Sequence, residues 1–185
     1  VCNMIMCVWL SEVEGSAELL LRYMRKLFDR QGGAFADFGD DDILQMQKLA
    51  RKVAYEGQRM RMFVRLQKAA DGTFFAPVSP VHNALPLSLE YFRDRFADQR
   101  WLIYETRRHY GYAYDLEEVR EVTLDRDDDL IEGKLSDELM AEDEKQFQQM
   151  WRTYHKAMAI QERINPRLQR QFMPRRYWKY LTEMQ

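Results

Sequence analysis

The sequence predicts an α+β fold: a small antiparallel sheet of about four to five strands packed with N-terminal helices, and a long C-terminal helix followed by a basic helical arm. Three observations carry this prediction. Apolar residues recur at helical spacing before residue 60, alternate with a period of two over much of 60–124, and return to helical spacing after residue 136. The 185 residues, 46% of them apolar, suffice for one such domain without disulfides.

We expect the chain, residues 1–185, to be a single domain with four consecutive parts. Residues 1–60 form a helical part with helices at 13–28 and 40–60, and three aspartates at 40–42 suit the positive N-terminal end of the second helix. Residues 60–124 form an antiparallel sheet with an inserted helix. Residues 125–135 form an acidic loop, and residues 136–185 form a long helix and a basic C-terminal arm.

Within residues 60–124 the pattern predicts two hairpins and a further strand. Strands at 60–67 and 73–78 flank the turn Asp71-Gly72, and a helix follows at 86–96. Strands at 100–106 and 110–114 form the second hairpin, and a fifth strand follows at 118–124.

The C-terminal part is predicted to be helical. Ser136 is expected to cap a helix that runs to residue 160 and carries the apolar stripe of Phe147, Trp151 and Tyr154. Pro166 and Pro174 are expected to begin two short helices, because proline suits the first helical position.

The composition excludes several classes of protein. Charged residues make up 31% of the chain, which excludes a membrane protein, and the apolar content excludes a disordered one. The apolar run that holds the two cysteines, Cys2 and Cys7, is too short to cross a bilayer. The cysteine spacing matches no redox or zinc motif, so we expect buried thiols and a reducing compartment, the cytoplasm.

The net charge of −2 conceals an uneven distribution along the chain. Residues 1–114 carry a net charge of +2, residues 115–144 carry −11, and residues 145–185 carry +7. An acidic block is therefore followed directly by a basic, aromatic-rich tail. Such asymmetry indicates either a charged partner or two blocks that neutralise each other.

The chain lacks most standard active-site motifs, so its catalytic residues are unknown and whether it is an enzyme stays open. It contains no dinucleotide-binding glycines, phosphate loop, nucleophile elbow or paired-histidine zinc helix. The acidic run 125–129 is not followed by the glycine and glutamate of a calcium loop. We therefore predict neither a metal nor a cofactor. His82, His109 and His155 are far apart in the sequence.

The basic arm holds the candidate binding residues. Arg163, Arg167 and Arg170 recur at the spacing of one helical stripe, and a helix beginning at Pro174 would place Arg175, Arg176 and Lys179 opposite Trp178 and Leu181. Two arginine stripes and two helix N-termini could hold phosphates. The alternative is a docking arm, whose aromatic face packs on the core and whose arginines pair with the acidic block. The candidate nucleic-acid-binding residues are Arg163, Asn165, Arg167, Arg170, Arg175, Arg176, Lys179, Arg107 and Arg108.

Several strings of the sequence resemble a bacterial family of uncharacterised proteins that are labelled with DNA metabolism or DNA repair. They are NPRLQRQ at 165–171, MPRRYWKYL at 173–181, LARKV at 49–53, RFADQRWLIY at 95–104 and RRHYG at 107–111. The resemblance covers about residues 40–183. Phe172 stands where that pattern has histidine and Thr182 where it has proline. The resemblance implies partners of two kinds: a uracil-DNA glycosylase-like domain, fused in some members, and a neighbouring radical S-adenosylmethionine (radical SAM) protein.

Three functions follow as hypotheses. The first is an accessory protein of DNA repair or DNA modification that contacts the nucleic-acid backbone through the basic arm, with Arg107 and Arg108 extending the surface. The second is a module that docks a partner DNA-repair or radical SAM enzyme without touching nucleic acid. The third is an enzyme with an unrecognised site near His82, His109 and Arg108.

Overall fold

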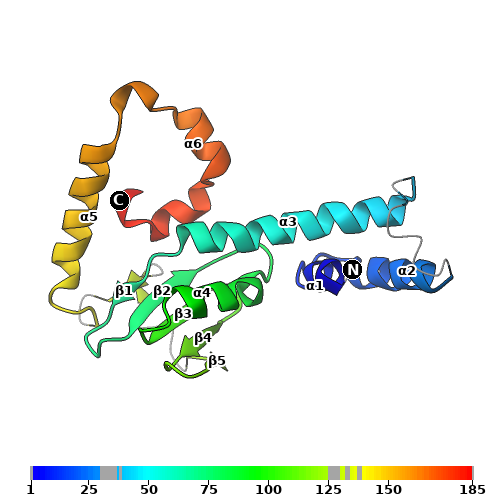
Figure 1. Cartoon of the computed structure of the whole chain (residues 1–185), viewed down its shortest axis with the longest axis horizontal. Helices are drawn as coiled ribbons and strands as arrows, with labels where there is room; N and C mark the ends of the chain where they lie inside the picture. The colour runs from blue at the N-terminus through cyan, green and yellow to red at the C-terminus, as the bar shows by residue number, and fades with distance from the viewer. Residues whose placement is uncertain are drawn as a thin grey trace. The chain divides into compact units, whose positions relative to one another are not determined.

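A computed structural model describes residues 2–29, 37, 39–124, 130–131, 134–136 and 139–184 (Figure 1). The chain forms two compact units, one made of residues 1–60 and 80–88 and the other of residues 61–79 and 89–185. Helices and a five-stranded sheet are both present, which confirms the α+β class. None of the described helices is both long and apolar enough to cross a membrane.

The first unit is helical, as the sequence predicts. Its elements are α1 (Cys2–Trp9), α2 (Ser16–Asp29), most of α3 (Asp41–Phe63) and the 3-10 helix η2 (Leu85–Ser88). Asp40 begins α3: its Oδ1 accepts the backbone N–H groups of Asp42 and Ile43 at 3.0 and 3.4 Å. The Cys7 thiol is buried as expected, and burial raises its pKa. The side chain of Cys2 lies outside the described part of the chain.

The second unit contains the sheet, whose strand order is β1-β2-β3-β4-β5. Its elements are β1 (Gln67–Lys68), β2 (Phe74–Val78), α4 (Leu89–Arg95), β3 (Trp101–Glu105), β4 (Tyr110–Tyr114) and β5 (Val119–Val122). The strands pair antiparallel except β2 and β3, which pair parallel from Phe74↔Trp101 to Val78↔Glu105. The prediction of an antiparallel sheet is therefore wrong at this pair. The connection through η2 and α4 returns the chain to the same end of the sheet, as a parallel pair requires.

The first predicted hairpin is also shorter than expected. Residues 60–63 belong not to a strand but to α3, which continues to Phe63. Met60 and Phe63 are both buried, and their separation of three residues places both side chains on one face of a helix. The strand predicted at 60–67 is thus reduced to the two residues of β1.

The helix predicted at 136–160 begins later than expected, as α5 (Glu144–Met158). Residues 139–141 instead bond to the backbone next to β1: Ala69 pairs with Met140, and the Ala70 N–H donates to the Leu139 carbonyl at 2.9 Å. Ser136 therefore does not cap α5. Within the predicted acidic loop, β6 (Leu130–Ile131) pairs with β7 (Lys134–Leu135), while residues 125–129 lie outside the described residues.

The arm follows α5 as four short helices. They are η4 (Gln161–Arg163), α6 (Pro166–Phe172), η5 (Arg175–Tyr180) and η6 (Thr182–Met184). Pro166 begins α6 as predicted, whereas Pro174 precedes η5 as its N-cap instead of occupying its first position. Tyr177 and Leu181 are buried against Phe63, so the aromatic side of η5 packs on the core of the second unit.

Candidate nucleic-acid interface

Three arginines in the first half of the arm are exposed. Arg163 ends η4, and Arg167 and Arg170 lie one turn apart on α6. Within the described residues, none of these three guanidinium groups has a hydrogen-bond or ion-pair partner. The predicted continuous stripe is broken at Asn165, because the residue before proline takes an extended conformation. Arg167 and Arg170 still share one side of α6.

The second half of the arm carries cations over aromatic rings. Its helix η5 is a 3-10 helix rather than the expected α-helix, so residues three apart lie on the same side. Tyr177 and Tyr180 are therefore buried together, whereas the sequence predicts that Tyr180 flanks the cations. The Arg176 guanidinium lies 4.9 Å from the Tyr177 ring centroid, and the Lys179 ammonium lies 4.7 Å from that of Tyr180. Arg175 lies 5.7 Å from the Trp178 ring. Contacts of this kind orient the three exposed cations at the surface.

Three acidic residues described next to or within the arm, Asp143, Glu144 and Glu183, bond to Lys68 or Arg65 of the second unit. Asp143 Oδ2 accepts from Lys68 Nζ at 3.0 Å, and Glu144 Oε2 accepts from the Lys68 backbone N–H at 3.1 Å. Glu183 lies within the arm, but it pairs with Arg65 at 2.7 Å. In the part of the chain that the structure describes, no ion pair joins the acidic block to the three exposed arginines of η4 and α6.

Asn165, another candidate residue, has a structural role. Its Oδ1 accepts the Leu168 backbone N–H at 3.0 Å and thereby caps α6. The Leu168 N–H at the N-terminus of α6 is therefore used within the chain, and the predicted contact of Asn165 with a phosphate stays a prediction.

The two arginines of the β3–β4 turn differ from each other. Arg107 is exposed, whereas Arg108 donates to Glu105 Oε1 at 2.8 Å, and the Glu105 side chain is fully buried. The charge of Arg108 offsets the free-energy cost of burying the Glu105 carboxylate inside the sheet. Arg108 therefore has a structural partner within the turn, and Arg107 is the more accessible of the two.

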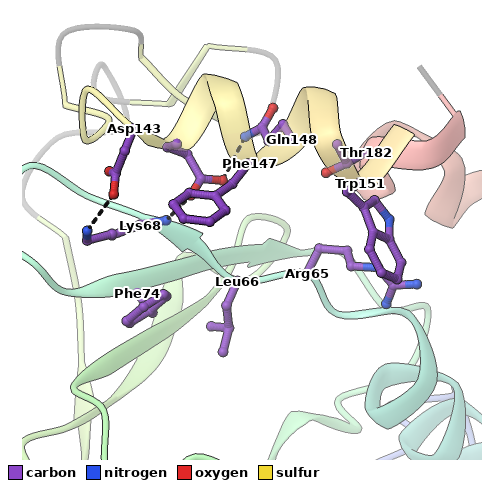
Figure 2. Close-up of a pocket in the computed structure, with 10 residues that line it drawn as sticks. Arg65, Leu66, Lys68, Phe74, Asp143, Phe147, Gln148, Trp151 and Thr182 are labelled. Carbon is purple, nitrogen blue, oxygen red and sulfur yellow. Dashed lines mark hydrogen bonds and ion pairs between the residues drawn. The ribbon is translucent and has the colours of Figure 1, made fainter. Parts of the chain in front are cut away.

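A cleft of about 630 Å³ lies between α5 and the β1–β2 edge of the sheet (Figure 2). Phe147 and Trp151 point into it from α5, and Leu66 and Phe74 line it from the strand side with side chains that point away from α5 (Figure 2). Lys68 and Asp143 lie at one end and Arg65 and Trp151 at the other (Figure 2). Nothing in the sequence pattern indicates this cleft, because its residues come from segments about 80 positions apart.

The charged side chains at both ends of the cleft are paired with each other or with Glu183. Glu183 accepts from Arg65 Nη2 at 2.7 Å and from the Trp151 indole N–H at 3.0 Å, and its side chain is only 4% exposed. Burial by itself raises the pKa of the Glu183 carboxyl, but the hydrogen bonds from Arg65 and Trp151 outweigh burial and hold that pKa below its ordinary value. Glu183 thus fixes both side chains at this end of the cleft.

The apolar stripe of α5 is largely exposed rather than buried. Phe147 and Met150 are 57% and 58% exposed, and Tyr154 and Met158 are similarly open to solvent. The sequence predicted the stripe correctly, but a stripe of this kind ordinarily faces a core. Exposed apolar residues continue into the arm at Ile160, Ile164, Leu168 and Phe172. The surface from α5 to α6 therefore combines apolar side chains with the three exposed arginines.

The three histidines are divided between the two units. His82 belongs to the first unit, where its Nδ1 lies 2.9 Å from the Ser11 carbonyl oxygen, and His109 and His155 belong to the second. His109 occupies the β3–β4 turn with a φ of 56°, and His155 is exposed on α5. Among the described residues, no three of the histidine, cysteine, aspartate and glutamate side chains gather as metal ligands.

A comparison with models of protein families finds a match over most of the chain. The model of a domain of unknown function, DUF4130, matches residues 14–183. Neither the curated proteins nor the solved structures contain a match.

Proposed function

The chain belongs to this family of domains of unknown function, and we propose that it is an accessory protein of DNA repair or DNA modification that contacts the nucleic-acid backbone through its basic arm. One observation carries the proposal: Arg163, Arg167 and Arg170 are exposed, and none has an acidic partner among the described residues. Cations left unpaired in this way remain available for an external anion.

The chemistry of the arm suits phosphate. A guanidinium group is planar, always charged, and donates two parallel hydrogen bonds to phosphate oxygens. The arm concentrates six cations between Arg163 and Lys179, with no acidic residue between them. Contacts of this kind position a protein on a nucleic acid and carry no base sequence. The proposal therefore predicts binding that is strong at low salt and weakly dependent on base sequence.

The proposed function is tested by the binding of fluorescent single-stranded and duplex DNA at low salt, followed by anisotropy. We expect the wild-type protein to bind. We expect Arg167→Glu/Arg170→Glu to lower the affinity about tenfold or more, and to reduce the salt slope by about 1 for each arginine that no longer binds a phosphate.

The matched control is Lys48→Glu/Arg51→Glu, an identical change of charge at two exposed cations three residues apart on α3. This variant should bind DNA nearly as the wild type does. The absence of binding by the wild type at low salt, or an equal loss in both double variants, would contradict the proposal.

A second candidate function, docking of a partner protein, is favoured by the exposed apolar side chains of α5 and α6. Met158, Leu168 and Phe172 are each about half exposed or more. Surfaces of this kind mark protein-interaction sites in soluble proteins. The partner implied by the family resemblance is a radical SAM protein or a uracil-DNA glycosylase-like domain.

The docking function is tested by mixing the purified partner with this protein after nuclease treatment and measuring the complex by sedimentation. Met158→Glu places a charge in the apolar surface and should dissociate the complex, whereas Lys156→Glu, on a neighbouring exposed position of α5, should not. If no complex forms without nucleic acid, this second function is wrong.

A further inference from the structure

We propose that the cleft between α5 and the β1–β2 edge receives an unpaired nucleobase from a single strand held by the basic arm, an inference that rests on the proposed function. The cleft has a volume of about 630 Å³, within the usual range of small-ligand sites. Its residues take no part in the phosphate contacts proposed above. The inference extends the proposed function from duplex or single strands in general to unpaired bases.

The cleft offers aromatic surfaces along α5. Phe147 and Trp151 extend from α5 into it, and Phe74 of β2 is also among its lining residues (Figure 2). The Trp151 ring is also flanked by Tyr154, at 5.7 Å between ring centroids. Nucleobases stack on such rings irrespective of their identity, because every base presents a π face. An aromatic heterocycle therefore matches the walls of the cleft.

The charges of the cleft are balanced, which disfavours a phosphate. Arg65 pairs with the buried Glu183, and Lys68 pairs with Asp143. The indole N–H of Trp151 is also used by Glu183, so Trp151 offers its ring face and not a donor. The cleft thus suits a neutral planar group, while the exposed arginines of η4 and α6 suit the phosphates of the same strand.

Two polar groups of the cleft could meet the edge of a base. Gln148 Nε2 donates to Glu144 Oε1 at 2.9 Å, and the Gln148 carbonyl oxygen has no partner among the described residues. Thr182, whose side chain carries a hydroxyl, lines the same cleft. A carbonyl acceptor and a hydroxyl can pair with the exocyclic and ring nitrogens of several bases.

The cleft and the arm are close enough to hold one strand. Thr182, which lines the cleft, follows Lys179 of η5 by three residues. Three residues span at most about 11 Å even when fully extended. A base in the cleft and phosphates on η5 would therefore lie within a few nucleotides of each other.

A peptide strand is a poorer occupant, because the β1 edge is already paired. The Lys68 N–H donates to Glu144, the Lys68 carbonyl accepts from Ala141 at 3.0 Å, and the Ala70 N–H donates to Leu139. These bonds use the backbone groups that an added strand would need. The remaining protein occupant is an apolar side chain of a second copy or a partner, which the experiment distinguishes.

The test uses the full chain and a short single-stranded DNA that contains a fluorescent adenine analogue. Stacking in the cleft should change the emission of the analogue, and Phe147→Ala should abolish that change and weaken binding about 5- to 150-fold. Phe147→Trp should restore both. Met150→Ala is the matched control, because Met150 is equally exposed on α5 but does not line the cleft.

The outcomes separate the inference from the function on which it rests. Binding that depends on Arg167 and Arg170 but is unaffected by Phe147→Ala would overturn the base site and leave the proposed function intact. Absence of any DNA binding would overturn both. If Phe147→Ala converts a dimer to a monomer in sedimentation and leaves emission unchanged, the cleft belongs to a second copy and the inference is wrong.

Discussion

Gly111 lies where β4 passes closest to β3. A Cβ atom at this position would lie 2.6 Å from the Ile103 carbonyl oxygen and 3.0 Å from Tyr104 Cα. Both are backbone atoms of a strand that is itself paired with β2 on its other side. A side chain here can be accommodated only by moving β4 away from β3.

We therefore expect Gly111→Ala to lower the free energy of unfolding by about 1–3 kcal/mol, the usual cost of overpacking. Urea denaturation followed by circular dichroism measures this loss. An unchanged denaturation midpoint would show that the sheet adjusts without cost and would contradict the close approach of the two strands.

Glu183 makes the stability of the second unit dependent on pH. Its hydrogen bonds with Arg65 and Trp151 hold the pKa of the carboxyl below the ordinary value of 4.5, although burial opposes this. A carboxyl with a lowered pKa in the folded state stabilises the fold above its unfolded pKa. That stabilisation is lost as the pH falls through the folded pKa.

Glu183→Gln should lower the free energy of unfolding by about 1.5–3 kcal/mol near neutral pH, the range for hydrogen bonds to a charged group. The difference from the wild type should shrink as the pH falls below about 4.5, because the carboxyl of the unfolded wild type is protonated first and that of the folded protein only below its lowered pKa. Urea denaturation of both proteins across this pH range is the measurement. If the difference in unfolding free energy between the two proteins stays constant with pH, the charge of Glu183 does not contribute to stability and the account is wrong.

At the scale of the elements, helices and strands with a regular spacing of apolar residues are predictable from the sequence, whereas short helices and strands are not. The helix at 40–60 and the hairpin of β3 and β4 follow directly from apolar periodicity. The strand predicted at 60–67 is misleading at its start, because the buried residues Met60 and Phe63 are three positions apart, a spacing that places both on one face of a helix. The 3-10 geometry of η5 is not predictable either, since i and i+3 spacing fits both helix types over six residues.

The start of α3 depends on one side chain. Asp40 Oδ1 accepts two backbone N–H groups, and the Asp40 carboxylate also pairs with Lys26 at 2.6 Å. The hydrogen bond from Lys26 is the main reason that the pKa of Asp40 is lowered.

Asp40→Ala should therefore cost about 0.5–2 kcal/mol of stability, as the loss of a helix cap does. Asp41→Ala, at the neighbouring exposed aspartate, is the control and should cost less, because in the described part of the chain no side-chain hydrogen bond of Asp41 caps the helix. Thermal denaturation compares the two variants. Equal losses would contradict the capping role of Asp40.

At the scale of the whole molecule, the sequence predicts where charge lies along the chain but not where it lies in space. The +7 of residues 145–185 is evident from the sequence, whereas the pairing of Asp143 with Lys68 and of Glu183 with Arg65 requires the fold. The parallel pairing of β2 and β3 and the cleft beside β1 depend on contacts between distant segments. Periodicity within one segment carries no information about such contacts.

The central claim is that the arm binds phosphates, above all through Arg163, Arg167 and Arg170. It is tested most directly by the association constant of the wild-type protein for single-stranded DNA over a series of salt concentrations. If these three arginines each contact a phosphate, log K should fall against log salt with a slope of about −2, and with a slope of about −4 if all six arm cations do. A slope near zero, or no binding at low salt, would contradict the claim.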